Sequence, residues 1–278
     1  MDNRIKTFLL LLVLTAIVLA IGSIFGKIGL IVAFIFVLIM NLFSYYFSDK
    51  IVLTLYRAKP LSKNHWLYKE VEKLAKKAGI NTPEVYISSF PIANAFATGR
   101  NPKNGVIVVT EKIIDMLNKD ELIGVLSHEI SHIKNRDILI ATIASVLAGV
   151  IMFIAAMARA QIIYGEREKN FGSLIALIII AFIAPFAALL IQLAISRTRE
   201  FLADESGARL IGDGKPLANA LLKLENQVKI PASKAIGLET TENLWIINPF
   251  SSEGLIKLFS THPPIKERVN RLLNLKFK

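Results

Sequence analysis

The chain has 278 residues, 53% of them hydrophobic, and a formal net charge of +11. It contains no cysteine, which excludes disulfide bonds and thiolate zinc sites and leaves histidine and carboxylate side chains as possible metal ligands. The apolar residues are concentrated in four long blocks, a distribution typical of membrane spans. Basic residues commonly flank spans on the cytoplasmic side, and no basic stripe with interleaved aromatic residues occurs, so nucleic acid is not an expected partner.

Two apolar blocks open the chain, at residues 8–24 and 28–46. A cleaved signal peptide would begin in a similar way, but the second block follows almost at once and no clear cleavage site precedes a soluble domain. We therefore expect residues 1–48 to form a transmembrane hairpin. The basic residues after it place this end of the hairpin, and the N-terminus, in the cytoplasm; they are Lys50, Arg57, Lys59 and Lys63.

Residues 49–137 are predicted to form the first part of a cytoplasmic domain. An amphipathic helix should run from His65 to about Ala78 and stop at Gly79. Short apolar runs bounded by turn residues predict a small β-sheet, with strands at 84–87, 94–99 and 105–109. Thr110 can cap a helix that follows the last strand.

The next predicted helix starts at Asp120 and contains the motif His-Glu-x-x-His at residues 128–132. Residues four apart share a helix face, so His128 and His132 can hold one Zn²⁺ at about 2.0–2.1 Å each. Glu129 lies beside that face, where a base can take a proton from a water activated by the metal. Such a pattern can also arise by chance on a helix surface. The apolar periodicity around it, and the presence of only four histidines in the chain, favour a site for one zinc ion.

The third and fourth apolar blocks cover residues 138–158 and 174–195. Each has about 21 residues, close to the ~20 that cross the hydrocarbon core, and Pro185 predicts a kink. The third block follows the motif without a helix breaker. A buried hairpin in a soluble protein would be equally apolar, but the chain offers no comparable amphipathic partner helices to bury it. We expect a second transmembrane hairpin at 138–195, which places the motif, residues 196–278 and both termini in the cytoplasm.

Carboxylates directly after the fourth block can complete the metal site. A catalytic zinc keeps three protein ligands and one open position, and no histidine lies near this segment. Glu200 and Asp204 are four residues apart and share a helix face. Glu200 can reach the metal, while Asp204, one turn further on, can accept the free ring N–H of a ligating histidine. Both could instead be solvated charges at the start of a helix.

The order of His-Glu-Ile-Ser-His, an apolar pair of blocks and then Arg-Glu-Phe-x-Ala-Asp resembles the HtpX family of membrane-anchored zinc endopeptidases. These are relatives of the CAAX prenyl endopeptidases and of the gluzincins. The resemblance covers nearly the whole chain and implies a mainly α integral membrane protein, with about four transmembrane helices and a cytoplasmic gluzincin-like zinc peptidase domain containing a small β-sheet. It implies zinc binding by His128, His132 and Glu200, with Glu129 as catalytic base and Asp204 orienting a zinc ligand, preferably His128.

Two further segments resemble motifs of this family. The run Asn94-Ala95-Phe96 resembles the edge strand that pairs with an extended substrate, although it could be an ordinary strand and turn. An exposed edge offers backbone N–H and C=O groups to any peptide sequence. The second segment is a His-Pro-Pro motif, in which His262 or Arg268 could donate to the oxyanion of the tetrahedral intermediate. The two prolines could equally do no more than start the last helix.

The sequence thus predicts a multi-pass zinc endopeptidase of the cell membrane, with polypeptide substrates and its active site on the cytoplasmic side. The family resemblance implies quality control of misfolded or damaged membrane proteins. Alternatives are a processing peptidase for one membrane or lipidated substrate, and a zinc-binding membrane scaffold without turnover. Glu129 argues against the scaffold, because zinc retention does not require it. A metal transporter would need ionisable residues within its spans, and the apolar blocks have almost none.

Overall fold

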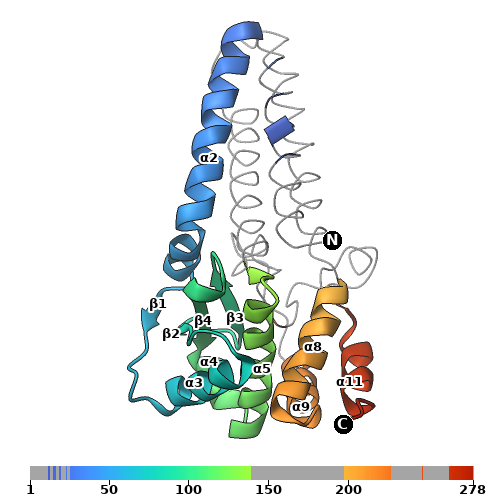
Figure 1. Ribbon diagram of the computed structural model, residues 1–278. Helices are drawn as coiled ribbons and strands as arrows, with labels where there is room; N and C mark the ends of the chain where they lie inside the picture. Colours follow the sequence, from blue (N-terminus) through green and yellow to red (C-terminus); the bar gives the residue numbers. More distant parts are fainter. Residues whose placement is uncertain are drawn as a thin grey trace.

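The computed structural model describes residues 26–138, 197–226, 246 and 263–277, together with a few isolated positions between 12 and 23 (Figure 1). The third and fourth apolar blocks, most of the first, and His262 lie outside the described residues. The number of membrane spans therefore stays a prediction, and so do the domain boundaries. In the part of the chain just listed, no helix is both long enough and apolar enough to cross a membrane.

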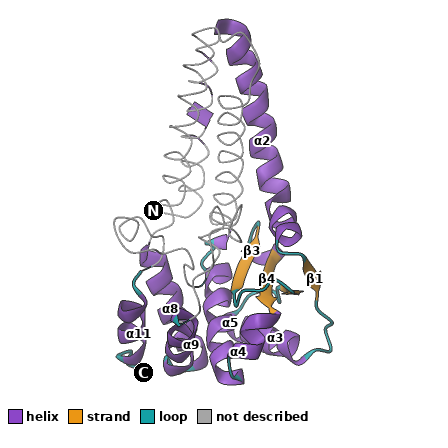
Figure 2. Ribbon diagram, turned by 180° about the vertical axis from the view of Figure 1, so that it is seen from behind, coloured by secondary structure: helices purple, strands orange, loops and turns teal. Residues whose placement is uncertain are grey.

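A single long helix, α2 (Gly26–Leu55), contains the second apolar block and extends away from the other labelled elements in both ribbon views (Figures 1 and 2). Many of its apolar side chains are exposed, among them Ile28, Ile31, Phe34 and Ile39. The helix continues nine residues beyond the expected end of the block. Its last turns are anchored because Val52 is buried in a cluster that also contains Tyr56 and Phe96.

The predicted β region forms one four-stranded sheet in the order β1-β2-β4-β3. Its strands are β1 (Ala58–Pro60), β2 (Glu84–Ser88), β3 (Ala95–Gly99) and β4 (Gly105–Thr110). β2 and β4 are parallel, whereas β1 and β3 run antiparallel to their neighbours. Three strands are as predicted. β1 was not predicted, because it is only three residues long and ends in proline, a residue that sheets tolerate at an edge.

The short helices near the sheet begin and end within one residue of the predicted positions. α3 (Trp66–Ala78) starts after His65, whose Nδ1 accepts the Leu67 N–H at 3.2 Å. It ends at Gly79, which adopts the left-handed conformation with φ 74° that favours glycine. Thr110 caps α4 (Glu111–Met116) through its hydroxyl. A short 3₁₀ turn, η1 (Pro102–Asn104), precedes β4.

The motif helix, α5 (Lys119–Lys134), lies between the sheet and the last three labelled helices (Figure 1). It begins one residue before the predicted Asp120, because Asn118 and Glu121 form a reciprocal capping box. The expectation of an unbroken passage into the third apolar block is wrong. Arg136 takes a left-handed conformation with φ 62°, and the Asp137 N–H turns back to the His132 carbonyl at 2.9 Å.

Three helices complete the described part: α8 (Arg197–Ile211), α9 (Lys215–Glu225) and α11 (Ile265–Leu273). α5 packs against α8 and α9, and α11 packs against both of these. One continuous apolar core joins α3, α5, α9 and one face of the sheet. The opposite face of the sheet packs on the end of α2 through Val106, Val108 and Phe96. The motif on α5 is therefore held from two sides.

Candidate metal centre

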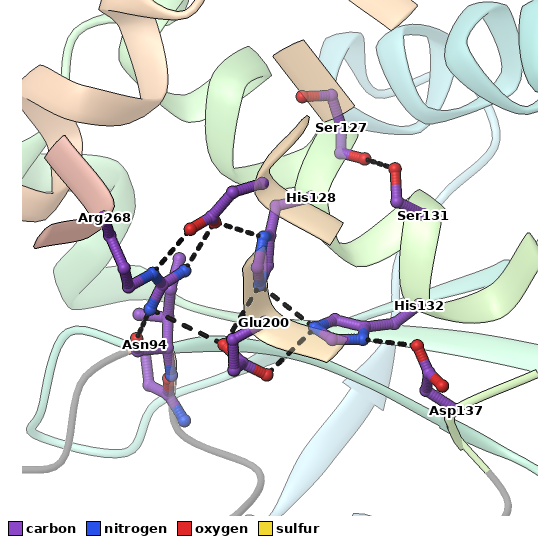
Figure 3. A network of polar contacts seen from close by, with 10 residues as sticks. Asn94, Ser127, His128, Ser131, His132, Asp137, Glu200 and Arg268 are labelled. Atoms are coloured by element: carbon purple, nitrogen blue, oxygen red, sulfur yellow. Dashed lines mark hydrogen bonds and ion pairs between the residues drawn. The ribbon is translucent and has the colours of Figure 1, made fainter. Parts of the chain in front are cut away.

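Two imidazoles from α5 form the base of the site (Figure 3). The Nε2 atoms of His128 and His132 are 3.0 Å apart, as their spacing of four residues on one helix requires. Two nitrogens that bind one tetrahedral zinc at 2.0–2.1 Å are separated by about 3.3 Å. The pair is therefore close to the geometry of a shared metal ion without rearrangement of the helix.

The third donor comes from α8, far away in the sequence. Oε2 of Glu200 lies 3.7 Å from His128 Nε2, and Oε1 lies 3.4 Å from His132 Nε2. One donor atom from each of the three residues lies within 4.8 Å of the other two, so the cluster can bind a metal. Two histidines and one glutamate are a donor set that catalytic zinc sites use, with a fourth position left open.

Glu129 lies next to this cluster and is only 4% exposed. Burial and the neighbouring Glu200 raise the pKa of Glu129 from its usual 4.5 to about 7, although His132 and a hydrogen bond from the Ala97 backbone oppose the rise. The backbone N–H of Ala97, on β3, therefore contacts the carboxylate of the motif glutamate. A buried carboxyl with a pKa near neutral can both accept and release a proton at physiological pH.

Asp204 stands one turn along α8 from Glu200, as expected. Its Oδ1 lies 2.9 Å from Nδ1 of His128, whereas Nε2 of the same ring faces His132 and Glu200 (Figure 3). The aspartate is 2% exposed. Burial alone would raise its pKa, but the charge and hydrogen bonds of Arg268, together with His128, outweigh burial and lower the pKa of Asp204. An ionised carboxylate thus faces the second nitrogen of a candidate ligand.

Arg268 makes different contacts from those expected of an oxyanion donor. The side chain is fully buried. Its Nε and Nη2 donate to the two carboxylate oxygens of Asp204 at 2.8 and 2.7 Å, and Nη1 donates to the Ile246 carbonyl at 2.9 Å. The guanidinium therefore holds Asp204 in place, although Nη1 also lies 3.6 Å from Glu200. The alternative oxyanion donor, His262, lies outside the described residues.

In the segment Asn94-Ala95-Phe96, the first and third residues make contacts within the fold, whereas the backbone of the second faces away from the sheet. The Asn94 carbonyl accepts the Thr110 N–H, and the Asn94 N–H donates to the Thr110 hydroxyl, each at 2.9 Å. The Asn94 Oδ1 accepts the Ile246 N–H at 3.2 Å. Phe96 is buried against Tyr56, with 4.7 Å between ring centroids. Because backbone groups alternate along a strand and the Asn94 carbonyl faces β4, the N–H and C=O of Ala95 point to the other side. No described strand occupies that side of β3.

Sequence reasoning missed Asp137. Its Oδ2 lies 3.2 Å from Nδ1 of His132, and its Oδ1 lies 3.6 Å from Nε of Arg199. Burial lowers the pKa of His132, but hydrogen bonds to Asp137 and Glu200 outweigh burial and hold it well above the usual value. A signal was present in the sequence. Each ligating histidine needs an acceptor for its second ring nitrogen, and Asp137 is the first carboxylate that follows the motif.

Comparisons with known proteins place the chain in a family. The model of Peptidase family M48 matches residues 61–276. Two proteins named Protease HtpX homolog, from Sulfurihydrogenibium sp. (strain YO3AOP1) and Pyrococcus furiosus, are each 48% identical to this chain. The alignments cover 99% and 96% of this chain and 97% and 94% of theirs.

The crystal structure of S. mikatae Ste24p has a similar fold, with a TM-score of 0.52 at 20% identity. The match covers 97% of this chain, which spans 65% of the length of the Ste24p chain. This likeness supports the fold, and the family assignment comes from the matches in sequence. The chain therefore belongs to peptidase family M48 and is a metalloprotease of the HtpX type.

Proposed function

We propose that this protein is a zinc-dependent endopeptidase of the cell membrane that cleaves polypeptides on the cytoplasmic side. The observation that carries the proposal is the buried cluster of His128, His132 and Glu200 with Glu129 beside it. The cluster offers two nitrogen donors and one carboxylate, which suits one Zn²⁺ per chain. When bound, the ion would supply Lewis acidity to the scissile carbonyl and to the attacking water.

Glu129 is the general base in this proposal. Its carboxylate takes a proton from the attacking water and passes it to the nitrogen of the leaving amine. In the metal-free protein, burial raises the pKa of Glu129 to about 7, near the pH at which a general acid–base group is most effective. The Ala97 N–H, by contacting the carboxylate, fixes the position of Glu129 relative to β3.

Substrate pairs with the outer edge of β3 in this proposal. An extended peptide can add to such an edge through main-chain hydrogen bonds, without a requirement for particular side chains. Ala95 is the residue of the Asn94–Phe96 segment whose backbone faces away from β4, and we assign the pairing to it, although it is buried in this structure. Asn94 supports the edge from behind, through its hydrogen bonds to Thr110 and Ile246. The contact between Ala97 and Glu129 brings this edge next to the metal cluster.

We propose a membrane topology of four spans, with hairpins at 1–48 and 138–195 and the two parts of the peptidase domain, 49–137 and 196–278, in the cytoplasm. The exposed apolar side chains of α2 and the four apolar blocks support it. Because the chain has no native cysteine, single cysteines can report sidedness to an impermeant thiol reagent. Ser62→Cys, at an exposed position, should be labelled only after the cells are permeabilised, and Ser173→Cys should be labelled in intact cells. The reverse pattern would contradict the topology.

The proposed substrates are misfolded or damaged membrane proteins. Support comes from the resemblance to the HtpX family, and from an edge strand that recognises backbone rather than sequence. The decisive experiment is casein cleavage by the purified full-length protein in detergent. Cleavage should stop with a zinc chelator, return when zinc is added, and fall at least about 10²-fold in Glu129→Gln. Cleavage that survives in Glu129→Gln would refute the mechanism, and cleavage confined to one defined substrate would favour a processing peptidase.

A further inference from the structure

Each of the two histidines faces a carboxylate of its own. Nδ1 of His128 lies 2.9 Å from Asp204. Nδ1 of His132 lies 3.2 Å from Asp137 (Figure 3). In both rings Nε2 points to the metal cluster. An N–H on Nδ1 that donates to a carboxylate leaves the lone pair of Nε2 directed at the cluster, which is the tautomer that a metal ligand needs.

The end of α5 places Asp137 for this contact. The left-handed turn at Arg136 directs the chain back on itself, and the Asp137 N–H donates to the His132 carbonyl at 2.9 Å. A non-glycine residue in this conformation is uncommon and costs energy. Asp137 thus contacts His132 twice, through the backbone and through the carboxylate, and it is only 5% exposed.

Arg199 reaches Asp137 from the neighbouring helix. Its Nε lies 3.6 Å from Asp137 Oδ1, and the side chain is 6% exposed. Within the described residues its guanidinium makes no hydrogen bond, so the ion pair with Asp137 is the contact that offsets its buried charge there. Arg199 directly precedes Glu200. α8 therefore contacts His132 in two ways, directly through Glu200 at 3.4 Å and indirectly through Arg199 and Asp137.

We propose that Asp137 and Arg199 are positioning residues that hold His132 in the orientation and tautomer of a metal ligand, with Arg199 acting through Asp137. The inference rests on the proposed zinc site. It parallels the pair of Arg268 and Asp204 on His128, but that arginine binds both oxygens of its aspartate at 2.7–2.8 Å. The looser contact of Arg199 predicts that its loss has a smaller effect than the loss of Asp137.

The test is the zinc affinity of the full-length protein in detergent, measured by competition with a chromophoric chelator. Asp137→Ala should weaken zinc binding by about 10–100-fold, as expected when the partner of a ligating histidine is removed. Asp137→Asn keeps an acceptor for the ring N–H and should recover part of that loss, which also guards against a folding defect in the alanine variant. Arg209→Gln is the matched control, because Arg209 forms an exposed ion pair with Glu205 on the same helix.

The step through Asp137 is tested by a double-mutant cycle. Arg199→Gln should weaken zinc binding several-fold in the parent and have no further effect in Asp137→Ala. Parent-like affinity in Asp137→Ala would refute the positioning of His132 while leaving the zinc site intact. An equal effect of Arg199→Gln in both backgrounds would refute the route through Asp137. A parent that binds no zinc would overturn the proposed function together with this inference.

Discussion

Gly207 of α8 lies directly against the backbone of His128. A Cβ atom at Gly207 would fall 2.9 Å from the His128 backbone nitrogen, a separation that side chains do not occupy. The absence of a side chain thus sets the approach of α8 to α5 at the level of the motif. The same approach brings Glu200 to both histidines and Asp204 to His128. The close packing of α8 on α5 therefore brings the three candidate metal ligands together.

Gly207→Ala should consequently damage the metal cluster. Alanine favours a helix over glycine by about 1 kcal/mol, but the added carbon meets backbone atoms that cannot move aside, and overpacking of this kind costs about 1–3 kcal/mol. We expect a lower melting temperature and weaker zinc binding than in the parent. Glu205→Ala, at an exposed position of the same helix, should change neither. An alanine variant with parent-like zinc affinity would show that α8 can shift without loss of the site.

A second prediction concerns the pH dependence of stability in the metal-free protein. Burial raises the pKa of Glu129 from 4.5 to about 7, so between these values the folded chain holds a proton that the unfolded chain has released. The contribution of Glu129 to the free energy of unfolding is therefore full at low pH and is lost as the pH rises through about 7. The glutamine of the Glu129→Gln variant has no ionisable group, so this variant should not lose that part of the free energy of unfolding.

The measurement is thermal unfolding of chelator-treated parent and Glu129→Gln at about pH 5 and pH 8. From pH 5 to pH 8, the free energy of unfolding of the variant should rise relative to that of the parent by on the order of 1–3 kcal/mol, since each pKa unit corresponds to about 1.4 kcal/mol. The comparison removes the titration of shared groups whose pKa Glu129 does not influence, such as Asp204. A difference in stability that does not change with pH would mean that Glu129 keeps an ordinary pKa.

Arg268 provides a third prediction, because its contacts point to support of Asp204. Removing one partner of a buried ion pair leaves an uncompensated charge and costs about 3–5 kcal/mol. Arg268→Ala should therefore lower the free energy of unfolding by that amount and weaken zinc binding. Lys266→Ala, at an exposed position of α11, serves as the control. If Arg268→Ala kept the parent's stability and lost only turnover, a direct role at the oxyanion would be the better explanation.

Much of the peptidase fold could be predicted, because local signals decide where its elements begin and end. Gly79 and Thr110 mark helix boundaries by their own chemistry, and both act as predicted, whereas His65 caps the helix that it was expected to begin. The end of α5 could not be predicted in this way. The left-handed conformation of Arg136 is disfavoured locally, and it becomes acceptable only in combination with the contacts that Asp137 makes to His132 and Arg199.

In the candidate site, too, features set by local sequence could be predicted, whereas contacts between distant segments could not. The spacing of four residues was enough to pair His128 with His132 and to place Glu200 and Asp204 on one face of a helix. The partners of the two aspartates were out of reach, because Arg268 meets Asp204 across 64 residues and Arg199 meets Asp137 across the interface between α8 and α5. Such contacts depend on the distance between helices. Gly207 fixes that distance by packing against the backbone of His128, a contact that cannot be recognised from the sequence alone.

The last prediction separates the two acids of α8. Glu200 lies within 3.4–3.7 Å of the Nε2 atoms of both histidines, whereas Asp204 contacts only the far nitrogen of His128. In Glu200→Ala two imidazoles remain to hold the ion, fewer than the three ligands of catalytic zinc sites. Most of the zinc should therefore be lost on dialysis.

Asp204→Asn should retain zinc at micromolar free metal but with affinity or activity reduced by about 10–100-fold, because only the partner of a ligand is altered. Glu205→Gln, an exposed acid on the same helix, should bind zinc like the parent. The order of the effects decides the assignment when metal content is measured after dialysis. Full zinc in Glu200→Ala with none in Asp204→Asn would make Asp204 the ligand. Full zinc in both variants would move the third ligand to another residue, with His262 the next candidate.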